Sequence, residues 1–330
     1  MSLKRMDPFT GYLIAVVTLA WLLPASGPTA AVLGWVVRVA IFGLFLSYGV
    51  RLSLGEVAAG IRNWRLQAAI TASTYLLFPL LGLAATQLAD SLLPASLLPG
   101  VVFACLVPST VQSAITLTSL ARGNIAAAMV SATWSNLLGV VATPALTWLL
   151  LGGARSGIGL AQFVSVVAQL LLPFAIGLAL HRRVATALQR LQPRWQYLDQ
   201  GVILLVVYAA FSQLFHSGAW RQLSPTVLAT LLLVVVAVLL LVTGLLWFGS
   251  GLLGFSRPDR IALLFCGSHK SVATGVPIAG TIFAATGIGL IVLPLLLYHQ
   301  AQLLLGAWLA ARLRRDNEAA GPSDGSPGPA

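Results

Sequence analysis

The sequence predicts an all-α polytopic membrane protein with ten transmembrane helices. The first observation is composition: 58% of the 330 residues are hydrophobic, 8% are charged, and the mean hydropathy is +0.93. Soluble domains carry charge on about a quarter of their residues. The second observation is a series of apolar stretches separated by short polar segments, and the third is the alternating placement of arginine along that series.

The apolar stretches have the composition of membrane helices and define the predicted spans. Their approximate ranges are 10–23, 30–48, 66–88, 101–120, 125–151, 158–180, 202–215, 227–248, 261–283 and 288–309. The first stretch ends at Leu23 and Pro24 without a small-residue cleavage site, so it is predicted to be a span rather than a removed signal peptide.

The placement of arginine and lysine predicts the orientation, because positive residues concentrate in cytoplasmic loops. With a cytoplasmic N-terminus, the cytoplasmic segments hold Lys4, Arg5, Arg51, Arg62, Arg65, Arg122, Arg182, Arg183, Arg190, Arg194, Arg257, Arg260, Arg312, Arg314 and Arg315. The outer loops hold Arg155 and Arg221, and Arg38 and Lys270 fall within spans. Both termini are therefore predicted to be cytoplasmic. The net charge of +11 follows from this topology, so no nucleic-acid partner is expected.

Two predicted spans do not read as simple lipid-facing helices. In the fourth span, Pro108 is followed by hydroxyl and amide side chains, and the ninth span contains Lys270 between Gly267 and Pro277. Proline removes a helical amide donor and glycine permits unusual torsions, so both spans are predicted to be interrupted. Unwound backbone can bind cations, while the N-termini of half-helices favour anions.

The two interrupted spans occupy matching places in two five-span halves. The halves cover about residues 1–155 and 156–315, which together form the transmembrane transporter domain, and residues 316–330 are predicted to be a disordered cytoplasmic tail. An odd number of spans in each half makes the halves insert with opposite orientation. Paired interruptions in such inverted repeats indicate a transporter site.

Depth places several polar clusters at one level of the membrane. Lys270 lies roughly 14 Å from the start of its span, near the middle of a ~30 Å hydrocarbon layer, where a cation is costly and usually marks a functional path. The predicted substrate- and ion-binding residues are Ser109, Thr110, Gln112, Ser113, Ser131, Ser135, Asn136, Ser268, His269, Lys270, Ser271, His299 and Gln302.

The sequence favours no enzyme class and no bound organic cofactor. It lacks a Walker sequence, a dinucleotide-binding glycine signature and a recognisable nucleophile motif. Cys105 and Cys266 both fall within predicted spans, so neither a disulfide framework nor a metal cluster is expected. Sodium is the one ion that remains a candidate.

At these segments the chain resembles the bile acid/sodium symporter superfamily, in the bacterial branch similar to the sodium/bile acid cotransporter 7 group. The resemblance lies in PSTVQSAITLTSLARGN at 108–124, LLPFAIGLAL at 171–180, LDQGVILLVVYAAFS at 198–212, FCGSHKSVATGVPIA at 265–279 and LPLLLYHQAQLLLGAW at 293–308. It implies ten helices, with a panel of spans 1, 2, 6 and 7 and a core of the other six. It also implies that spans 4 and 9 cross where they unwind.

The resemblance further implies sodium sites beside that crossing, near Ser113, Ser131, Ser135 and Ser268. Family members supply a carboxylate and a glutamine from span nine, but 261–283 contains no Asp or Glu here. The Lys270 ammonium carries the charge of one sodium ion and could replace it. Alternatively, Lys270 could release its proton, with His269 or His299 as relay. A third reading gives His269 and Lys270 only a stabilising role.

We therefore expect a secondary active transporter in the bacterial inner membrane that moves a small organic anion by alternating access. One alternative is proton-coupled or uncoupled transport with Lys270 in place of sodium. A second is a non-transporting membrane regulator or receptor that keeps the fold. The sequence fixes neither the substrate nor the oligomeric state.

Overall fold

The computed structural model describes residues 8–51, 63–151, 160–189, 192–283 and 287–319, and its regular secondary structure there is helical. These residues contain no β-strand. Eight of the described helices are long and apolar enough to cross a membrane, and Phe9–Leu22 is a shorter apolar helix. The chain is therefore a multi-pass membrane protein, as its hydropathy predicts.

Helices in the first half of the chain coincide with the first five predicted spans. They are α1 (Pro8–Leu22), α2 (Gly27–Arg51), α4 (Trp64–Ala72), the π-helical turn η2 (Ser73–Leu77), α5 (Phe78–Ala89), α6 (Leu98–Leu106), α7 (Gln112–Leu120) and α8 (Ile125–Leu150). The elements α4, η2 and α5 follow one another without a break. In place of the predicted span 101–120 there are two nine-residue helices, α6, which begins three residues earlier at Leu98, and α7.

Helices in the second half cover the remaining predicted spans. They are α9 (Leu160–Gln189), α10 (Gln192–His216), the short 3₁₀ turn η3 (Ala219–Gln222), α11 (Pro225–Leu252), α12 (Arg257–Ser268), α13 (Val272–Ile282) and α14 (Ile288–Ala319). The last helix extends four residues into the tail for which the sequence predicted disorder. The rest of that tail, 320–330, lies outside the described residues.

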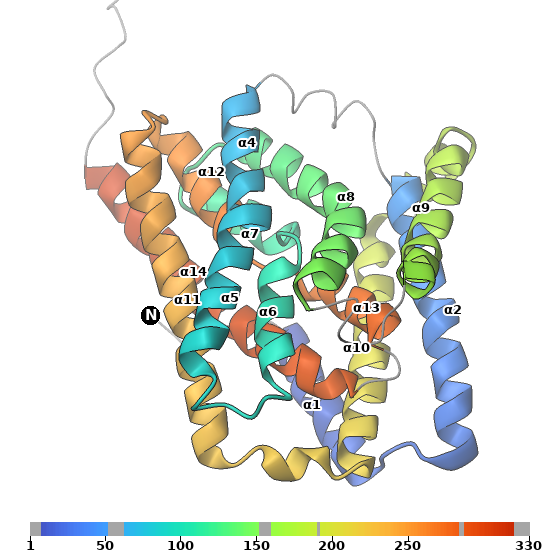
Figure 1. Ribbon diagram of the computed structural model, residues 1–330. Helices are drawn as coiled ribbons and strands as arrows, with labels where there is room; N and C mark the ends of the chain where they lie inside the picture. Colours follow the sequence, from blue (N-terminus) through green and yellow to red (C-terminus); the bar gives the residue numbers. More distant parts are fainter. Residues whose placement is uncertain (1–7, 52–62, 152–159, 190–191, 284–286, 320–330) are drawn as a thin grey trace, which may run out of the picture.

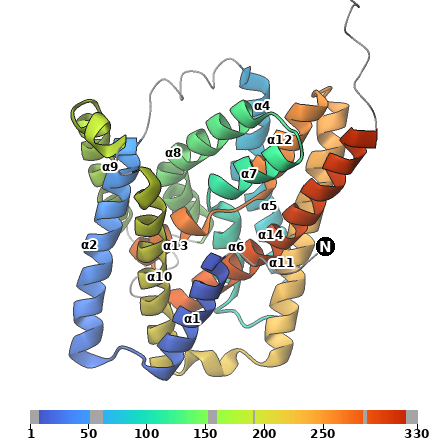
Figure 2. The same ribbon diagram turned by 180° about the vertical axis from the view of Figure 1, so that it is seen from behind.

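The helices pack in two groups that contact each other. In one group α2 packs against α9 and α10, and α1 packs against α10. In the other, α6 packs against α5 and α14, while α12 packs against α7 and α11. Figures 1 and 2 show α2, α9 and α10 on one flank and α4, α11 and α12 on the other. Contacts of α13 with α9 and α10 join the groups.

Burial sets the segment of α12 and α13 apart from the other helices. In the most apolar window of Arg257–Ile282, 94% of the residues are buried inside the protein, compared with 22% for α2. Its neighbours are therefore protein side chains rather than lipid. That placement makes a lysine within it tolerable, because cations in membrane proteins face the bundle interior.

Candidate functional site

Two non-helical segments meet inside the protein. The first is 107–111, between α6 and α7, and the second is 269–271, between α12 and α13. The Ser271 backbone N–H donates to the Pro108 carbonyl at 2.8 Å. Figure 2 shows the strand-like connection from α12 to α13 passing the region of α6 and α7. We call this meeting point the crossing.

The five consecutive carbonyls from Cys105 to Ser109 all find partners at the crossing. Buried backbone requires such partners, because an unpaired carbonyl away from water costs free energy. Their donors are the Lys270 ammonium for Cys105 and Val107, Thr143 for Leu106, the Ser271 amide for Pro108 and the Asn136 amide for Ser109. Tertiary contacts thus replace the helical hydrogen bonds of this segment.

Lys270 lies at the centre of the crossing and is fully buried. Its Nζ donates to three backbone carbonyls: Val107 at 2.9 Å, Cys105 at 3.0 Å and Thr74 at 3.3 Å. The Phe78 ring adds a cation–π contact, with its centroid 3.8 Å from Nζ. An ammonium has three donors, so its capacity is filled without a carboxylate.

The Thr74 carbonyl is available because the π-helical turn shifts the hydrogen bonds of its span. The Phe78 N–H bonds to Ser73 instead of Thr74. The next residue that could pair with Thr74 in this turn is Pro79, which has no N–H. A π turn often marks a functional place in a helix. Here it provides a carbonyl oxygen for Lys270.

The backbone of Lys270 is held by the side chain of Gln302 on α14. Gln302 Oε1 accepts from the Lys270 N–H at 2.7 Å, and Gln302 Nε2 donates to the Lys270 carbonyl at 2.9 Å. The Tyr298 hydroxyl, one turn earlier, donates to the Ser268 carbonyl at 2.7 Å. Helix α14 thus satisfies the peptide groups exposed by the end of α12.

Helix α8 joins the two non-helical segments through Ser135 and Asn136. The Ser135 hydroxyl accepts from the Ser109 N–H at 3.0 Å. Asn136 Nδ2 donates to the Ser109 carbonyl at 2.9 Å, and its Oδ1 accepts from the Thr274 hydroxyl at 2.5 Å. Gly139 allows this approach, because a Cβ there would lie 2.7 Å from the Pro108 ring.

Four helix ends give the crossing two electrostatic sides. Helices α6 and α12 end there, while α7 and α13 begin there. Carbonyl ends favour cations and amide ends favour anions. Lys270 occupies the carbonyl side through Cys105 and Val107. On the amide side, just before α7, the Ser109 hydroxyl is buried and has no hydrogen-bond partner.

Not every residue of the predicted site reaches the crossing. Gln112 is exposed at the start of α7, and the Ser113 hydroxyl bonds to Thr110 at 2.7 Å. The Ser131 hydroxyl donates to Ala127 within its own helix, and the Ser268 hydroxyl does the same to Leu264. These bonds are local. They arise because buried hydroxyls readily bond to the carbonyl four residues earlier.

His269 belongs to the segment 269–271, but its imidazole bonds back to α12 rather than across the crossing, and His299 lies on α14. The His269 Nδ1–H donates to the Phe265 carbonyl at 2.9 Å, which leaves the buried Nε2 without a hydrogen-bond partner. His299 is half-buried, and its Nδ1 lies 2.9 Å from Gln302 Nε2. Its Nδ1 also lies 3.4 Å from the Lys270 carbonyl. Both ring nitrogens of His269 are thus accounted for without a bond to the Lys270 ammonium.

The residues around the crossing do not fit a resident sodium ion. Three carbonyl oxygens at the crossing are already bonded to the Lys270 ammonium, and in the part of the chain that the structure describes no carboxylate bonds to this ammonium. The four serines predicted near sodium, Ser113, Ser131, Ser135 and Ser268, bond to four separate partners. No group of three or more His, Cys, Asp or Glu among the described residues could hold a metal ion.

Sequence reasoning missed several groups that build the crossing. The Thr74, Cys105 and Val107 contributions come from backbone carbonyls, whose roles depend on which segments meet. Thr143 and Tyr298 were not predicted either, although both bond to exposed carbonyls. The sequence does contain a signal for Thr74. Pro79 lies five residues later and has no N–H, so the Thr74 carbonyl stays unpaired in a π turn.

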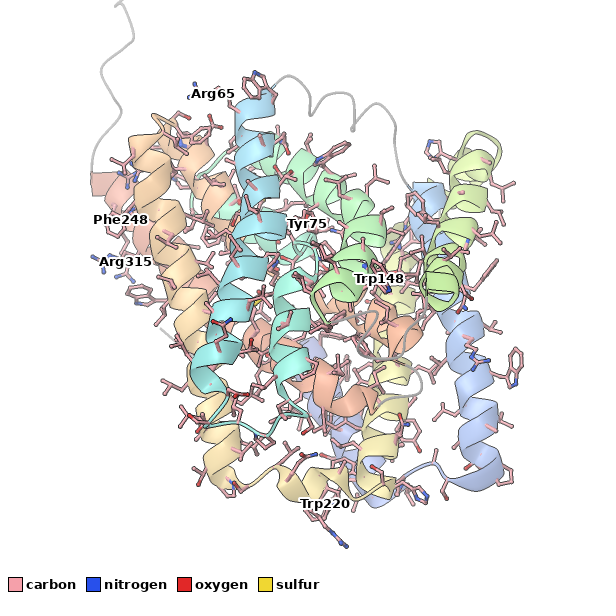
Figure 3. The ribbon with its side chains drawn as sticks, in the orientation of Figure 1. Arg65, Tyr75, Trp148, Trp220, Phe248 and Arg315 are labelled. Atoms are coloured by element: carbon pink, nitrogen blue, oxygen red, sulfur yellow. The ribbon has the colours of Figure 1, made fainter. Side chains whose placement is uncertain are left out.

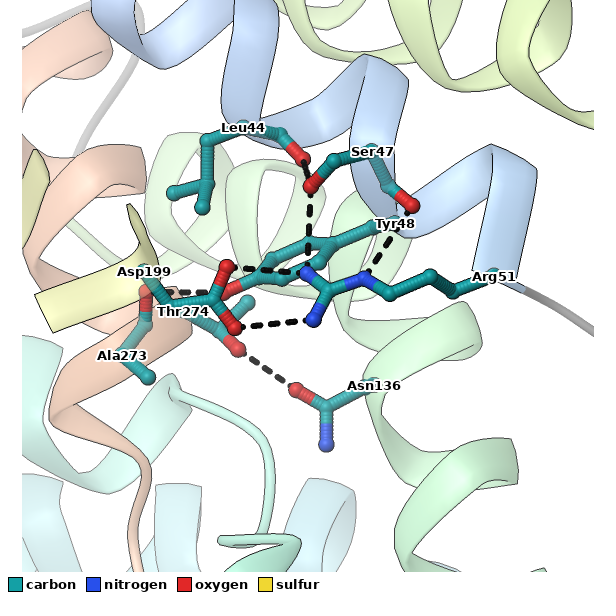
Figure 4. Close-up of polar contacts among 8 residues, drawn as sticks. All are labelled: Leu44, Ser47, Tyr48, Arg51, Asn136, Asp199, Ala273 and Thr274. Carbon is teal, nitrogen blue, oxygen red and sulfur yellow. Dashed lines mark hydrogen bonds and ion pairs between the residues drawn. The ribbon is translucent and has the colours of Figure 1, made fainter. Parts of the chain in front are cut away.

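A second polar cluster lies between α2, α10 and α13 (Figure 4). The Arg51 guanidinium forms two hydrogen bonds with Asp199, at 2.9 and 3.0 Å. The Tyr48 ring lies against Arg51, and its hydroxyl donates to the Ala273 carbonyl at 3.4 Å. Ala273 is next to Thr274, which bonds to Asn136. This cluster therefore connects α2 and α10 to the crossing.

A multi-pass helical bundle with a buried, non-helical polar site is the architecture of secondary transporters. The chain belongs to the SBF-like CPA transporter family, whose profile matches residues 7–315. It is a membrane transporter of this family, which is not a family of enzymes.

Relatives share nearly the whole length of the chain. Uncharacterized protein PA2026 of Pseudomonas aeruginosa is 45% identical over 320 residues, or 95% of each chain. YfeH of Escherichia coli, a candidate symporter by name, is 38% identical and covers 96% of each chain. Sodium/bile acid cotransporter 7 of Mus musculus is 31% identical over 84% of this chain and 82% of its own.

Proposed function

We propose that this protein moves a small organic anion across the membrane by alternating access. In this proposal α6 with α7, and α12 with α13, are two discontinuous spans of inverted five-span repeats. Helices α1, α2, α9 and α10 form a panel, and the remaining helices form the core. The site would consist of polar residues around the crossing and the helix ends that meet there.

The observation that carries the proposal is the amide side of the crossing. Helices α7 and α13 both begin at the crossing, and the N-terminus of a helix attracts negative charge. The Ser109 hydroxyl, buried and unpartnered, lies just before α7. A carboxylate could accept from this hydroxyl and from free amides of the first turn of α7. The Lys270 charge nearby favours an anion over a cation.

The substrate class also agrees with the family relation. One relative carries the name sodium/bile acid cotransporter 7, and bile acids are organic anions. Ser113, Thr110 and the exposed Gln112 continue from Ser109 toward the surface of α7. They provide further donors for the polar part of a substrate. Movement of the panel against the core would open this region to one side of the membrane and then the other.

Uptake into liposomes tests the proposal directly. Purified protein in liposomes should accumulate at least one labelled carboxylate or sulfonate with saturable kinetics, above protein-free liposomes. Because Ser109 contacts the anion in this proposal, Ser109→Ala should raise KM about 10-fold to 150-fold, the range expected for one lost hydrogen bond to a charged group. Ser119→Ala, at the exposed far end of α7, is the matched control.

Absence of uptake and of substrate-dependent thermal stabilisation across a broad panel of organic anions would contradict the proposal. Equal KM values for the parent, Ser109→Ala and Ser119→Ala would leave transport in place but remove Ser109 from the site.

A further inference from the structure

We propose that the Lys270 ammonium is a built-in cation that takes the place of a coupling ion, so that this protein works without binding sodium. The inference rests on the proposed function in one respect, namely that the protein moves a substrate. The cation itself is a property of the crossing. It can be tested without any substrate.

The ligands of Lys270 Nζ are those that a small metal cation would take. Backbone carbonyl oxygens are the groups that replace the hydration shell of an alkali cation in membrane proteins. Here the three oxygens come from three elements, η2, α6 and the segment after α6, and surround one positive charge at 2.9–3.3 Å. Among the described residues, Lys270 is the charged side chain that bonds to these three oxygens.

Neighbouring groups balance the charge with dipoles rather than with a carboxylate. The ends of α6 and α12 present their negative poles at the crossing. The Phe78 face adds a further attraction at 3.8 Å. A sodium ion at the same place would face a like charge a few Å away without an acidic residue to offset it. The electrostatics of the crossing thus favour a single monovalent cation.

The ammonium also holds the crossing together permanently. A bound sodium ion can leave when the site opens, whereas Lys270 is attached to α12 and α13 and fastened by Gln302. The bonds of Lys270 to Thr74, Cys105 and Val107 therefore do not depend on ion concentration. The sodium gradient, as a result, would not drive the transport cycle.

Thermal unfolding of the purified protein in detergent, with sodium chloride titrated against choline chloride at constant ionic strength, tests the inference. A protein with a sodium site of about 1 mM dissociation constant would gain about 100-fold in its folded-to-unfolded ratio at roughly 100 mM sodium. We expect no sodium-specific shift in the parent Tm. Lys270→Ala should have a lower Tm, which sodium or propylammonium chloride raises because either cation can bind the vacated carbonyls.

Two variants separate the cation from general damage to the crossing. Lys270→Met keeps most of the side-chain volume without the charge, so it blocks the site and should not respond to sodium or propylammonium. Thr143→Val removes the donor of the neighbouring Leu106 carbonyl but leaves Lys270 in place. It should lower the Tm with no recovery in either salt.

A sodium-specific rise in the parent Tm would overturn the inference, as would equal behaviour of Lys270→Ala and Thr143→Val in sodium. If Lys270→Ala cannot be purified, the parent titration and sodium-22 binding to the parent decide the question. Absence of both would support the built-in cation and presence of either would refute it. Loss of anion uptake in the parent would reject the proposed function but leave this result unchanged.

Discussion

At the scale of single residues, the crossing depends on side chains that satisfy exposed peptide groups. Gln302 is the clearest case, because one amide pairs with both the N–H and the carbonyl of Lys270. It is fully buried on α14. The Gln side chain provides a donor and an acceptor in one neutral planar amide, and Asn, which has the same amide, is one methylene shorter.

Replacing Gln302 should therefore destabilise the protein strongly. Gln302→Leu leaves the buried Lys270 N–H unpaired and its carbonyl with only the 3.4 Å contact to His299, and an unpaired buried group costs about 1–3 kcal/mol. Gln300→Leu is the matched control on the same helix, since it removes a half-buried hydrogen bond with Thr10. We expect Gln302→Leu to lower the Tm in detergent clearly more than Gln300→Leu. Equal losses would show that the Lys270 peptide finds other partners.

At the scale of elements, close packing of α2 and α9 depends on two glycines. A Cβ at Gly49 would lie 2.0 Å from the Phe174 carbonyl oxygen, and one at Gly177 would lie 2.1 Å from the Leu46 oxygen. These are backbone atoms, which cannot rotate away. Small residues at helix contacts allow such approach in membranes. The glycines thus set the distance between α2 and α9.

Alanine substitution tests this contact with a control in the same helix. Gly49→Ala forces α2 away from α9, and we expect a loss of about 1–3 kcal/mol from overpacking. Gly43→Ala has no atom within 4 Å of its new Cβ and gains helix propensity. Thermal unfolding should therefore show a decrease for Gly49→Ala and no decrease for Gly43→Ala. Matching decreases in both variants would place the effect in α2 itself rather than in the contact.

At the scale of the whole molecule, a predicted cytoplasmic segment and a predicted outer loop lie at opposite ends of the bundle. Figure 3 shows Arg65 at one end and Trp220, within η3, at the opposite end. Arg65 belongs to a segment that the sequence predicts to be cytoplasmic, and Trp220 belongs to a predicted outer loop. Arg155 and Arg190, which also bear on orientation, lie outside the described residues. The orientation in the membrane stays a prediction.

Cysteine labelling in intact cells tests that orientation. We expect Trp220→Cys to react with an impermeant thiol reagent from outside, and Arg65→Cys and Arg315→Cys to react only after permeabilisation. Trp220 is preferable to Gly218, whose φ of 72° strains any other residue. The parent is a suitable control because Cys105 and Cys266 are buried. The reverse labelling pattern would invert the predicted topology.

The hydrophobic pattern of the sequence predicts where the helices form. A described helix lies in each of the ten predicted ranges, because hydrophobic runs in a bilayer must satisfy their backbone internally. Helix α6 ends at Leu106, shortly before Pro108, and α12 ends at Ser268, where the polar run around Lys270 begins. Burial of Lys270 was also predictable, since a cation at that depth avoids lipid.

Tertiary structure decided which groups surround Lys270. The carbonyl of Thr74 comes from a span almost 200 residues away, and Gln302 from a helix beyond the crossing. Ser131 shows the converse, because its hydroxyl bonds to the Ala127 carbonyl in its own helix and not to a group at the crossing. Backbone carbonyls are present at every residue, so sequence alone cannot single them out. Only the packing of η2, α6 and the two non-helical segments selects the oxygens that meet one positive charge.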